Sequence, residues 1–170
     1  RASIESRYRA LDGAWAGLPH RVLFSVKSSS SLGLLGIVAR LGGGADVVSG
    51  GELVRALRAG IPADRIVFAG AGKTDAELLQ ALETGIDHIN IESEGELARL
   101  VRLSGEHRLA ARVAFRITPQ VVGGTHAYTE TGTAVTKFGL APEEALALAR
   151  ALDPAGPIRL AGLHVHFGSQ

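Results

Sequence analysis

Short apolar runs alternate along this chain with longer segments in which apolar residues recur at helical spacing. The short runs, rich in β-branched residues, predict strands at Val22–Val26, Asp46–Val48, Arg65–Ala69, His88–Ile91, Ala111–Ile117 and Arg159–Phe167. The longer segments predict helices at Leu32–Leu41, Gly51–Ala59, Asp75–Glu83, Glu94–Leu103 and Pro142–Leu152. Two start signals support these helices: Thr74 with Glu77 three residues on is a capping box, and Pro142 suits a first helical turn.

A strand followed by a helix, repeated at regular spacing, predicts an α/β fold with a parallel sheet and helices outside it. Two architectures share this pattern, an open doubly wound sheet and a TIM (β/α)8 barrel, and the regular repeat favours the barrel. Six βα units against the eight of a barrel predict a partial one. The connection from Thr118 to Leu140 is long, polar and rich in glycine, which is typical of functional loops.

Composition narrows the class of protein. The 170 residues suffice for one domain with a core, and 46% hydrophobic and 21% charged residues with a net charge of +1 are ordinary for a globular protein. No basic block indicates nucleic acid, no apolar run approaches the roughly 20 residues of a membrane helix, and no segment resembles a signal peptide. We therefore expect a cytoplasmic protein without nucleic-acid or membrane partners. The absence of cysteine excludes disulfides and thiolate metal sites.

The ends of the chain predict a fragment. The chain starts at Arg1, contains no methionine, and stops at Gln170 directly after a strand pattern, with no closing helix. We expect residues 1–170 to be part of one barrel domain that is cut at both ends.

Ligands of both candidate architectures bind at the carboxyl ends of the strands, and Lys27 follows an apolar strand there. The chain has two other lysines, Lys73 and Lys137. Lys27 would face a ring of other strand ends, partly removed from water, and desolvation lowers the pKa of an amine as Schiff-base chemistry requires. The alternative is a lysine that extends to solvent at the barrel rim. Gly70–Thr74 is similar to a phosphate-binding P-loop, but Val67 stands where that motif needs glycine, which favours a tight turn.

Two more strands carry candidate residues. His164 and His166 are two apart on a strand and share a face, as a metal pair or as packed histidines would. Arg116 lies in an apolar strand and needs a partner if it is buried; Asp46 and Glu52 are the expected ones, in a structural ion pair or in an active site. After the last strand, Gly168 and Ser169 offer N–H groups and a hydroxyl to a phosphate, or form a plain turn.

Taken together, these segments resemble the fold-type III pyridoxal-phosphate-dependent decarboxylases, whose barrel is alanine racemase-like. The resemblance spans Arg21 to Gln170. It is carried by Phe24-Ser25-Val26-Lys27, Ala45–Leu53, Arg65–Phe68 with Lys73, Asn90–Ser93, Arg116–Pro119, Lys137–Leu140 and Gly162–Gln170. The segment Thr125–Gly132 is similar to a stretch typical of the diaminopimelate decarboxylases, and it implies meso-diaminopimelate as the amino-acid substrate and L-lysine plus CO2 as products.

The resemblance implies a role for each candidate. Lys27 would bind pyridoxal 5'-phosphate covalently, His166 would stack on its ring, and Gly168 with Ser169 would contact its phosphate. Asp46, Glu52 and Arg116 would form the polar network around the Schiff base. The resemblance also implies a homodimer, with Lys137 near its interface.

Other parts of the family pattern are missing from these 170 residues: a later glycine-rich phosphate turn, the carboxylate that faces the ring nitrogen, and the C-terminal β-domain. We therefore expect residues 1–170 alone to be inactive. The alternatives are a decarboxylase of another amino acid, a non-catalytic homologue that binds the cofactor, and a metal-dependent barrel hydrolase that uses His164 and His166.

Overall fold

The structure is a computed structural model that describes residues 2–118 and 138–166. Six parallel strands form one sheet in the order β1-β2-β3-β4-β5-β6. Their bounds are β1 (Leu23–Ser25), β2 (Gly44–Val47), β3 (Ile66–Phe68), β4 (His88–Ile91), β5 (Ala111–Ile117) and β6 (Ile158–Val165). An open doubly wound sheet contains a point where the strand order reverses, whereas a barrel follows the chain without reversal. The predicted partial barrel is therefore confirmed.

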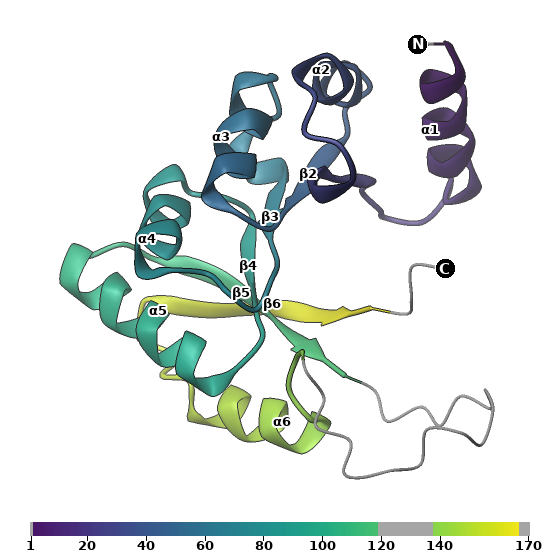
Figure 1. The fold of residues 1–170 in the computed structure, drawn as a ribbon. Coiled ribbons are helices and arrows are strands. Elements are labelled where there is room, and N and C mark those ends of the chain that lie inside the picture. Colours follow the sequence, from purple (N-terminus) through teal and green to yellow (C-terminus); the bar gives the residue numbers. More distant parts are fainter. Residues whose placement is uncertain (1, 119–137, 167–170) are drawn as a thin grey trace, which may run out of the picture.

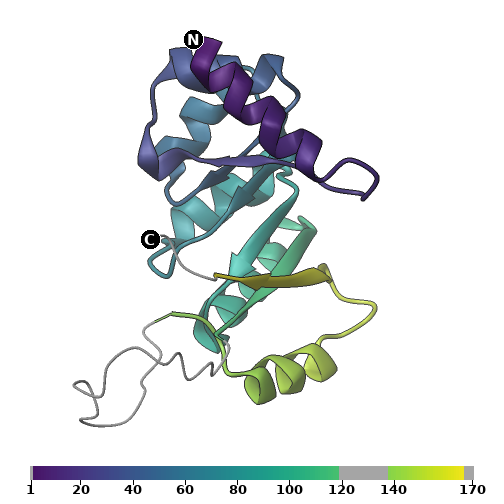
Figure 2. The same ribbon diagram turned by 90° about the vertical axis from the view of Figure 1, so that its right-hand side faces the viewer.

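Five helices lie on the outer side of this curved sheet, whereas the first, α1 (Ala2–Ala14), lies apart from them (Figure 1 and Figure 2). The five are α2 (Leu32–Arg40), α3 (Gly50–Arg58), α4 (Asp75–Thr84), α5 (Glu94–His107) and α6 (Pro142–Ala151), with short 3-10 turns η1 (Val26–Ser28) and η2 (Ala63–Arg65). Figure 1 shows α2 to α6 as an arc around the strands, and Figure 2 shows the same sheet after a quarter turn. The core fills the space between helices and strands, with Phe68, Ile91 and Phe115 among its fully buried side chains.

Three consecutive βα units begin their helices with the same local device. The side chains of Ser49, Thr74 and Ser93 accept a hydrogen bond from the backbone N–H three residues on, at Glu52, Glu77 and Glu96 respectively. Each of these glutamates turns its carboxylate back toward the loop before the helix. The Thr74 capping box is thus confirmed, and it belongs to a repeat that positions the loops at the carboxyl ends of the strands.

Helix α1 was not among the predicted elements. Ile4, Tyr8 and Leu11 stand at helical spacing in it, but none of its residues is buried. The first predicted strand also ends earlier than expected, because Val26 and Lys27 belong to η1. The helix predicted at Glu94–Leu103 continues four residues further, to His107, and the remaining helices and strands agree with the prediction to within two residues at each described end.

Both ends of the long connection after β5 are anchored. Thr118 N donates to Leu140 O at 3.0 Å and Leu140 N donates to Arg116 O at 2.8 Å, so the returning chain lies parallel to the end of β5. Gly139 between them has φ +85°, and a Cβ there would lie 2.9 Å from Arg116 O. A larger residue at position 139 would therefore disturb the backbone of the β5 end.

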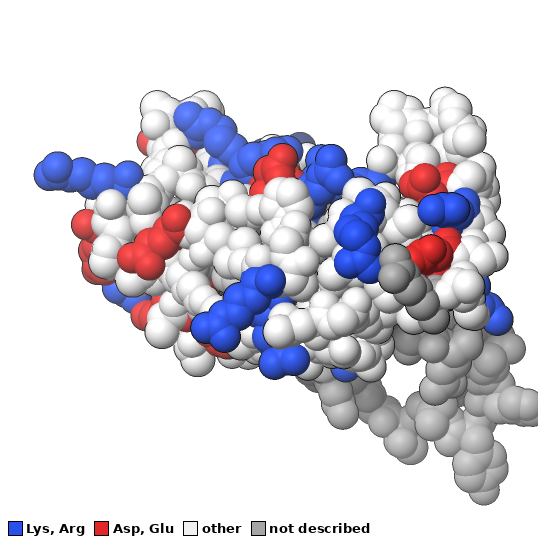
Figure 3. Space-filling view, turned by 90° about the horizontal axis from the view of Figure 1, so that it is seen from above, with Lys and Arg blue, Asp and Glu red and all other residues white. Residues whose placement is uncertain are grey.

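Charges of both signs lie on the one face of the molecule that a space-filling view presents (Figure 3). Figure 3 shows Lys and Arg side chains interspersed with Asp and Glu on the face seen from above. None of the helices among the described residues is long and apolar enough to cross a membrane.

Candidate active site

A cavity of about 330 Å³ opens where the strands end at their carboxyl side. Its lining residues come from η1, β2, the exit of β3, β5, the anchored return of the long connection, and β6. They are Lys27, Asp46, Val48, Ala69, Gly70, Arg116, Phe138, His164 and His166. Four residues singled out from the sequence, Lys27, Asp46, Arg116 and His166, thus meet at one cavity although they are far apart in the chain.

Lys27 is placed by the 3-10 turn η1 that follows β1. The turn is supported by Ser28 Oγ, which donates to Ser25 O at 2.7 Å. Among the described residues Lys27 is exposed and lines the cavity.

Asp46 lies on β2 beside Ser25 of β1. Ser25 Oγ donates to Asp46 Oδ2 at 3.4 Å, while the buried Oδ1 has no hydrogen-bond partner. Burial raises the pKa of Asp46, and the nearby cation of Lys27 opposes that shift. An unpartnered, half-desolvated carboxylate oxygen at a cavity is a group that a polar ligand can satisfy.

Arg116 does not pair with Asp46 or Glu52, so that expectation was wrong. Its Nη1 donates to Glu92 Oε2 at 2.8 Å, and its guanidinium lies 5.3 Å from the centre of the Phe138 ring. Pairing of β4 with β5 sets Ile91 beside Phe115, which brings the next two residues, Glu92 and Arg116, together. Glu52 instead accepts a hydrogen bond from Val48 N at 2.8 Å and is not among the residues that line the cavity.

The other described lysine, Lys73, is closed off from the cavity. Its Nζ donates at 2.7 Å to Gly70 O, to Asn90 O and to Glu96 Oε1, and its side chain is fully buried. Desolvation lowers the pKa of Lys73, and the carboxylate of Glu96 opposes the shift. Lys73 is therefore a structural cation, and Lys27 is the described amine that a ligand in the cavity can reach. The ion pair of Lys73 with Glu96 had a signal in the sequence, because both residues lie a few positions after the end of a predicted strand.

His164 and His166 both line the cavity from one face of β6 and its end. His166 is exposed, whereas His164 Nδ1 is buried without a partner, and burial followed by the charge of Arg116 lowers the pKa of His164. Within residues 2–118 and 138–166, no group of three or more Asp, Glu, His or Cys residues could hold a metal ion. Gly168, Ser169, Lys137 and Thr125–Gly132 lie outside the described residues.

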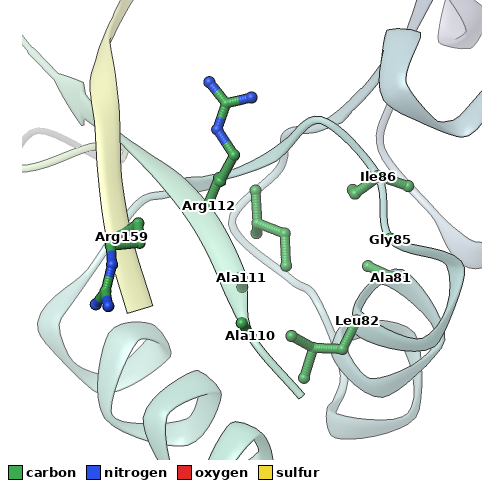
Figure 4. A pocket seen from close by; sticks show the side chains of 9 residues that line it. Ala81, Leu82, Gly85, Ile86, Ala110, Ala111, Arg112 and Arg159 are labelled. Carbon is green, nitrogen blue, oxygen red and sulfur yellow. The ribbon is translucent and has the colours of Figure 1, made fainter. Parts of the chain in front are cut away.

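A second cavity lies at the opposite ends of the strands (Figure 4). It measures about 240 Å³ and is lined by Ala81, Leu82, Gly85, Ile86, Ile89, Ala110, Ala111, Arg112 and Arg159. Its lining is apolar except for two arginines, whose guanidinium groups point apart in Figure 4. Because it offers neither a nucleophile nor an acid–base group, the chemistry is assigned to the carboxyl ends.

Comparison with known proteins separates the remaining alternatives. The family model "Pyridoxal-dependent decarboxylase, pyridoxal binding domain" matches residues 1–170. The chain belongs to this family. The cofactor of this pyridoxal-binding domain is pyridoxal 5'-phosphate, and the cavity fits it in chemistry: a reachable amine for the aldehyde, imidazoles beside it, and two buried polar atoms that still lack partners.

Relatives of this pyridoxal-binding domain are similar over the whole chain. It is 45% identical over 170 residues to a diaminopimelate decarboxylase of Pseudomonas aeruginosa, and the match covers 100% of this chain and 41% of that protein. It is 46% identical over 162 residues to a diaminopimelate decarboxylase of Zymomonas mobilis, covering 95% of this chain and 38% of that protein. The chain thus spans about two fifths of the length of these relatives.

Solved structures agree with the fold. Diaminopimelate decarboxylase from Helicobacter pylori, complexed with L-lysine, has a TM-score of 0.89 at 36% identity, covering 98% of this chain and 42% of that chain. Lysine decarboxylase from Selenomonas ruminantium has a TM-score of 0.77 at 25% identity, covering 98% of this chain and 40% of that chain.

Proposed function

We propose that residues 1–170 are the N-terminal part of the cofactor-binding barrel of a decarboxylase that converts meso-diaminopimelate to L-lysine and CO2. The observation that carries this proposal is the meeting of Lys27, Asp46, Arg116 and His166 at one cavity in a pyridoxal-binding domain. The substrate is proposed from the relatives, since the diaminopimelate decarboxylases named above are 45% and 46% identical, against 25% for the lysine decarboxylase. A homodimer in the cytoplasm completes the proposal.

In this proposal each of the cavity residues has a different role. Lys27 Nζ would hold the cofactor through its aldehyde and would carry a proton at the reacting carbon. Asp46 and Arg116 bring opposite charges to the same cavity and would orient the polar edge of the bound group, and His166 would lie against its ring. Gly168 and Ser169 are proposed to contact the phosphate. Pyridoxal phosphate supplies the electron sink that accepts the electron pair left when CO2 departs.

Covalent labelling tests the proposed role of Lys27. The full-length protein is purified with its cofactor, reduced with borohydride and digested, and its peptides are analysed by mass spectrometry. We expect the reduced cofactor on Lys27, and loss of the label in Lys27→Ala, because Lys27 is the reachable amine of the described cavity. A label on Lys73 or Lys137, or no label at all, contradicts the proposal.

A substrate panel tests the reaction. CO2 release is measured with meso-diaminopimelate, L-lysine, L-ornithine and L-arginine as substrates. We expect kcat/KM for meso-diaminopimelate to exceed that for the others by at least about 100-fold, the order that polar recognition of a second amino-acid end can supply. If kcat/KM is higher for lysine or ornithine, the protein is a decarboxylase but the proposed substrate is wrong. If none of the four amino acids releases CO2, the proposed activity is wrong.

A further inference from the structure

Glu92, the residue after β4, connects two groups that line the cofactor cavity. Its Oε2 accepts from Arg116 Nη1 at 2.8 Å, and its Oε1 accepts from Gly70 N at 2.7 Å. The Glu92 side chain is 2% exposed and does not line the cavity itself. One carboxylate therefore joins Gly70 at the exit of β3 to Arg116 at the end of β5, two residues that line the cavity floor.

The position of Glu92 is fixed by a closed ring of hydrogen bonds. Glu92 N donates to Glu96 Oε2 at 2.8 Å, and Glu96 Oε1 accepts from Lys73 Nζ at 2.7 Å. Lys73 Nζ donates back to Gly70 O, whose own N–H is bound by Glu92. The N–H and the carbonyl of Gly70, and the N–H and the carboxylate of Glu92, are thus all hydrogen-bonded within the chain, which leaves little freedom to shift.

The charges in this ring balance. Lys73 and Arg116 bring two cations, and Glu92 and Glu96 bring two anions. A carboxylate can accept from both Gly70 N and Arg116 at once, whereas an amide at position 92 accepts from one and turns an N–H toward the other. The negative charge of Glu92 is consequently what holds the guanidinium in place, since a partly buried cation that loses its partner turns toward water.

We infer that Glu92 is a positioning residue: it holds the Arg116 guanidinium and the Gly70 peptide at the floor of the cofactor cavity without touching the cofactor or the substrate. This inference rests on the proposed function, because Arg116 acts at that cavity.

The variant Glu92→Gln in the full-length protein tests it. We expect kcat to fall about 10- to 100-fold, the usual cost of losing an orienting partner. The dissociation constant of pyridoxal phosphate, measured by equilibrium dialysis, is expected to rise about 10-fold. The visible circular dichroism of the bound cofactor should change with it, because that signal reports the asymmetry of the groups around the cofactor.

Glu77→Gln is the matched control. The Glu77 carboxylate also bridges two βα loops, since Oε1 accepts from Gly50 N at 2.9 Å and Oε2 from Thr74 N at 3.0 Å, but neither Glu77 nor these two partners line the cavity. We expect all three readouts to stay within about twofold of the unmodified protein, as for substitutions away from the site. If Glu92→Gln behaves like Glu77→Gln, the inference is overturned.

A double-mutant cycle tests whether Glu92 acts through Arg116. In an Arg116→Gln background, Glu92→Gln should change kcat and the cofactor dissociation constant by less than about twofold, because the shared interaction is already lost. If the fold-changes that the two single substitutions cause in kcat or in the cofactor dissociation constant multiply in the double variant, the inference is overturned.

Two further outcomes keep the test decisive. If Glu92→Gln alone does not fold, the double variant removes both charges of the pair and should fold, with the cofactor affinity of Arg116→Gln. Failure of the double variant to fold makes Glu92 a folding residue and overturns the inference. Failure of the proposed function is distinct: the unmodified protein would then carry no cofactor on Lys27.

Discussion

The two ends of the strands carry polar groups in different arrangements. At the carboxyl ends, three buried side-chain atoms on the described strands have no hydrogen-bond partner: Asp46 Oδ1, Asn90 Oδ1 and His164 Nδ1. At the amino ends, Asp87 before β4 is shared by three cationic or protonatable groups. Its Oδ1 pairs with Arg112 at 2.8 Å, and its Oδ2 with Arg21 and with His88 Nδ1 at 3.3 Å each.

The difference shows that in this barrel the residues at the amino ends of the strands stabilise the fold, whereas those at the carboxyl ends are arranged to bind a ligand. The amino-end cluster ties the approach to β1 to the starts of β4 and β5, and its polar atoms are satisfied within the chain. The carboxyl-end cavity keeps desolvated atoms without partners, which costs stability in the absence of a ligand and becomes favourable when one binds. This division is typical of barrels, in which chemistry is confined to one end.

The largest effect is expected inside the carboxyl-end loops, at Lys73. Lys73→Met leaves Glu96 buried without its cation and should lower the free energy of unfolding by about 3–5 kcal/mol, measured by urea denaturation. Adding Glu96→Gln removes the stranded charge and keeps an acceptor for Glu92 N, so it should recover part of the loss. A loss below 1 kcal/mol would mean that this buried pair does not support the cavity floor.

A smaller effect is expected at the amino ends. Asp87→Asn weakens three partly exposed pairs and should lower the free energy of unfolding by about 1–2 kcal/mol, with cofactor affinity unchanged. The control is Asp64→Asn, because Asp64 is exposed and contacts Arg21 through its backbone oxygen only. A change in cofactor affinity on Asp87→Asn would show that the two ends are coupled and would break the comparison.

The smallest effect has the opposite sign. Because burial raises the pKa of Asp46, the folded chain binds this proton more tightly than the unfolded chain, and the ionised carboxylate lowers stability above the raised pKa. Asp46→Asn should therefore raise the stability of the cofactor-free protein at pH 8 by less than about 1 kcal/mol. The gain should shrink as the pH falls toward the ordinary Asp pKa of about 3.9. A gain that is independent of pH would rule out the desolvated carboxylate as its cause.

Local patterns in the sequence were enough to predict the repeating βα units and the strand that leads to Lys27. Strand and helix periodicity depends on neighbouring residues, and so does the Thr74 capping box. Motif similarity brought Lys27, Asp46, Arg116 and His166 together as candidates before any geometry. Helix α1 was missed although Ile4, Tyr8 and Leu11 stand at helical spacing in it, and the structure shows that it buries none of its residues.

Tertiary structure alone decided which charges meet. Asp46 on β2 is separated from β5 by two strands, whereas the register of β4 against β5 sets Glu92 beside Arg116. The complete burial of the Lys73 side chain likewise depends on tertiary structure, because its partners come from the loop after β3, from β4 and from α5. Periodicity in the sequence predicts which face of the sheet a side chain takes. The register between neighbouring strands, which decides the residue that it meets on the next strand, is a property of the packed sheet.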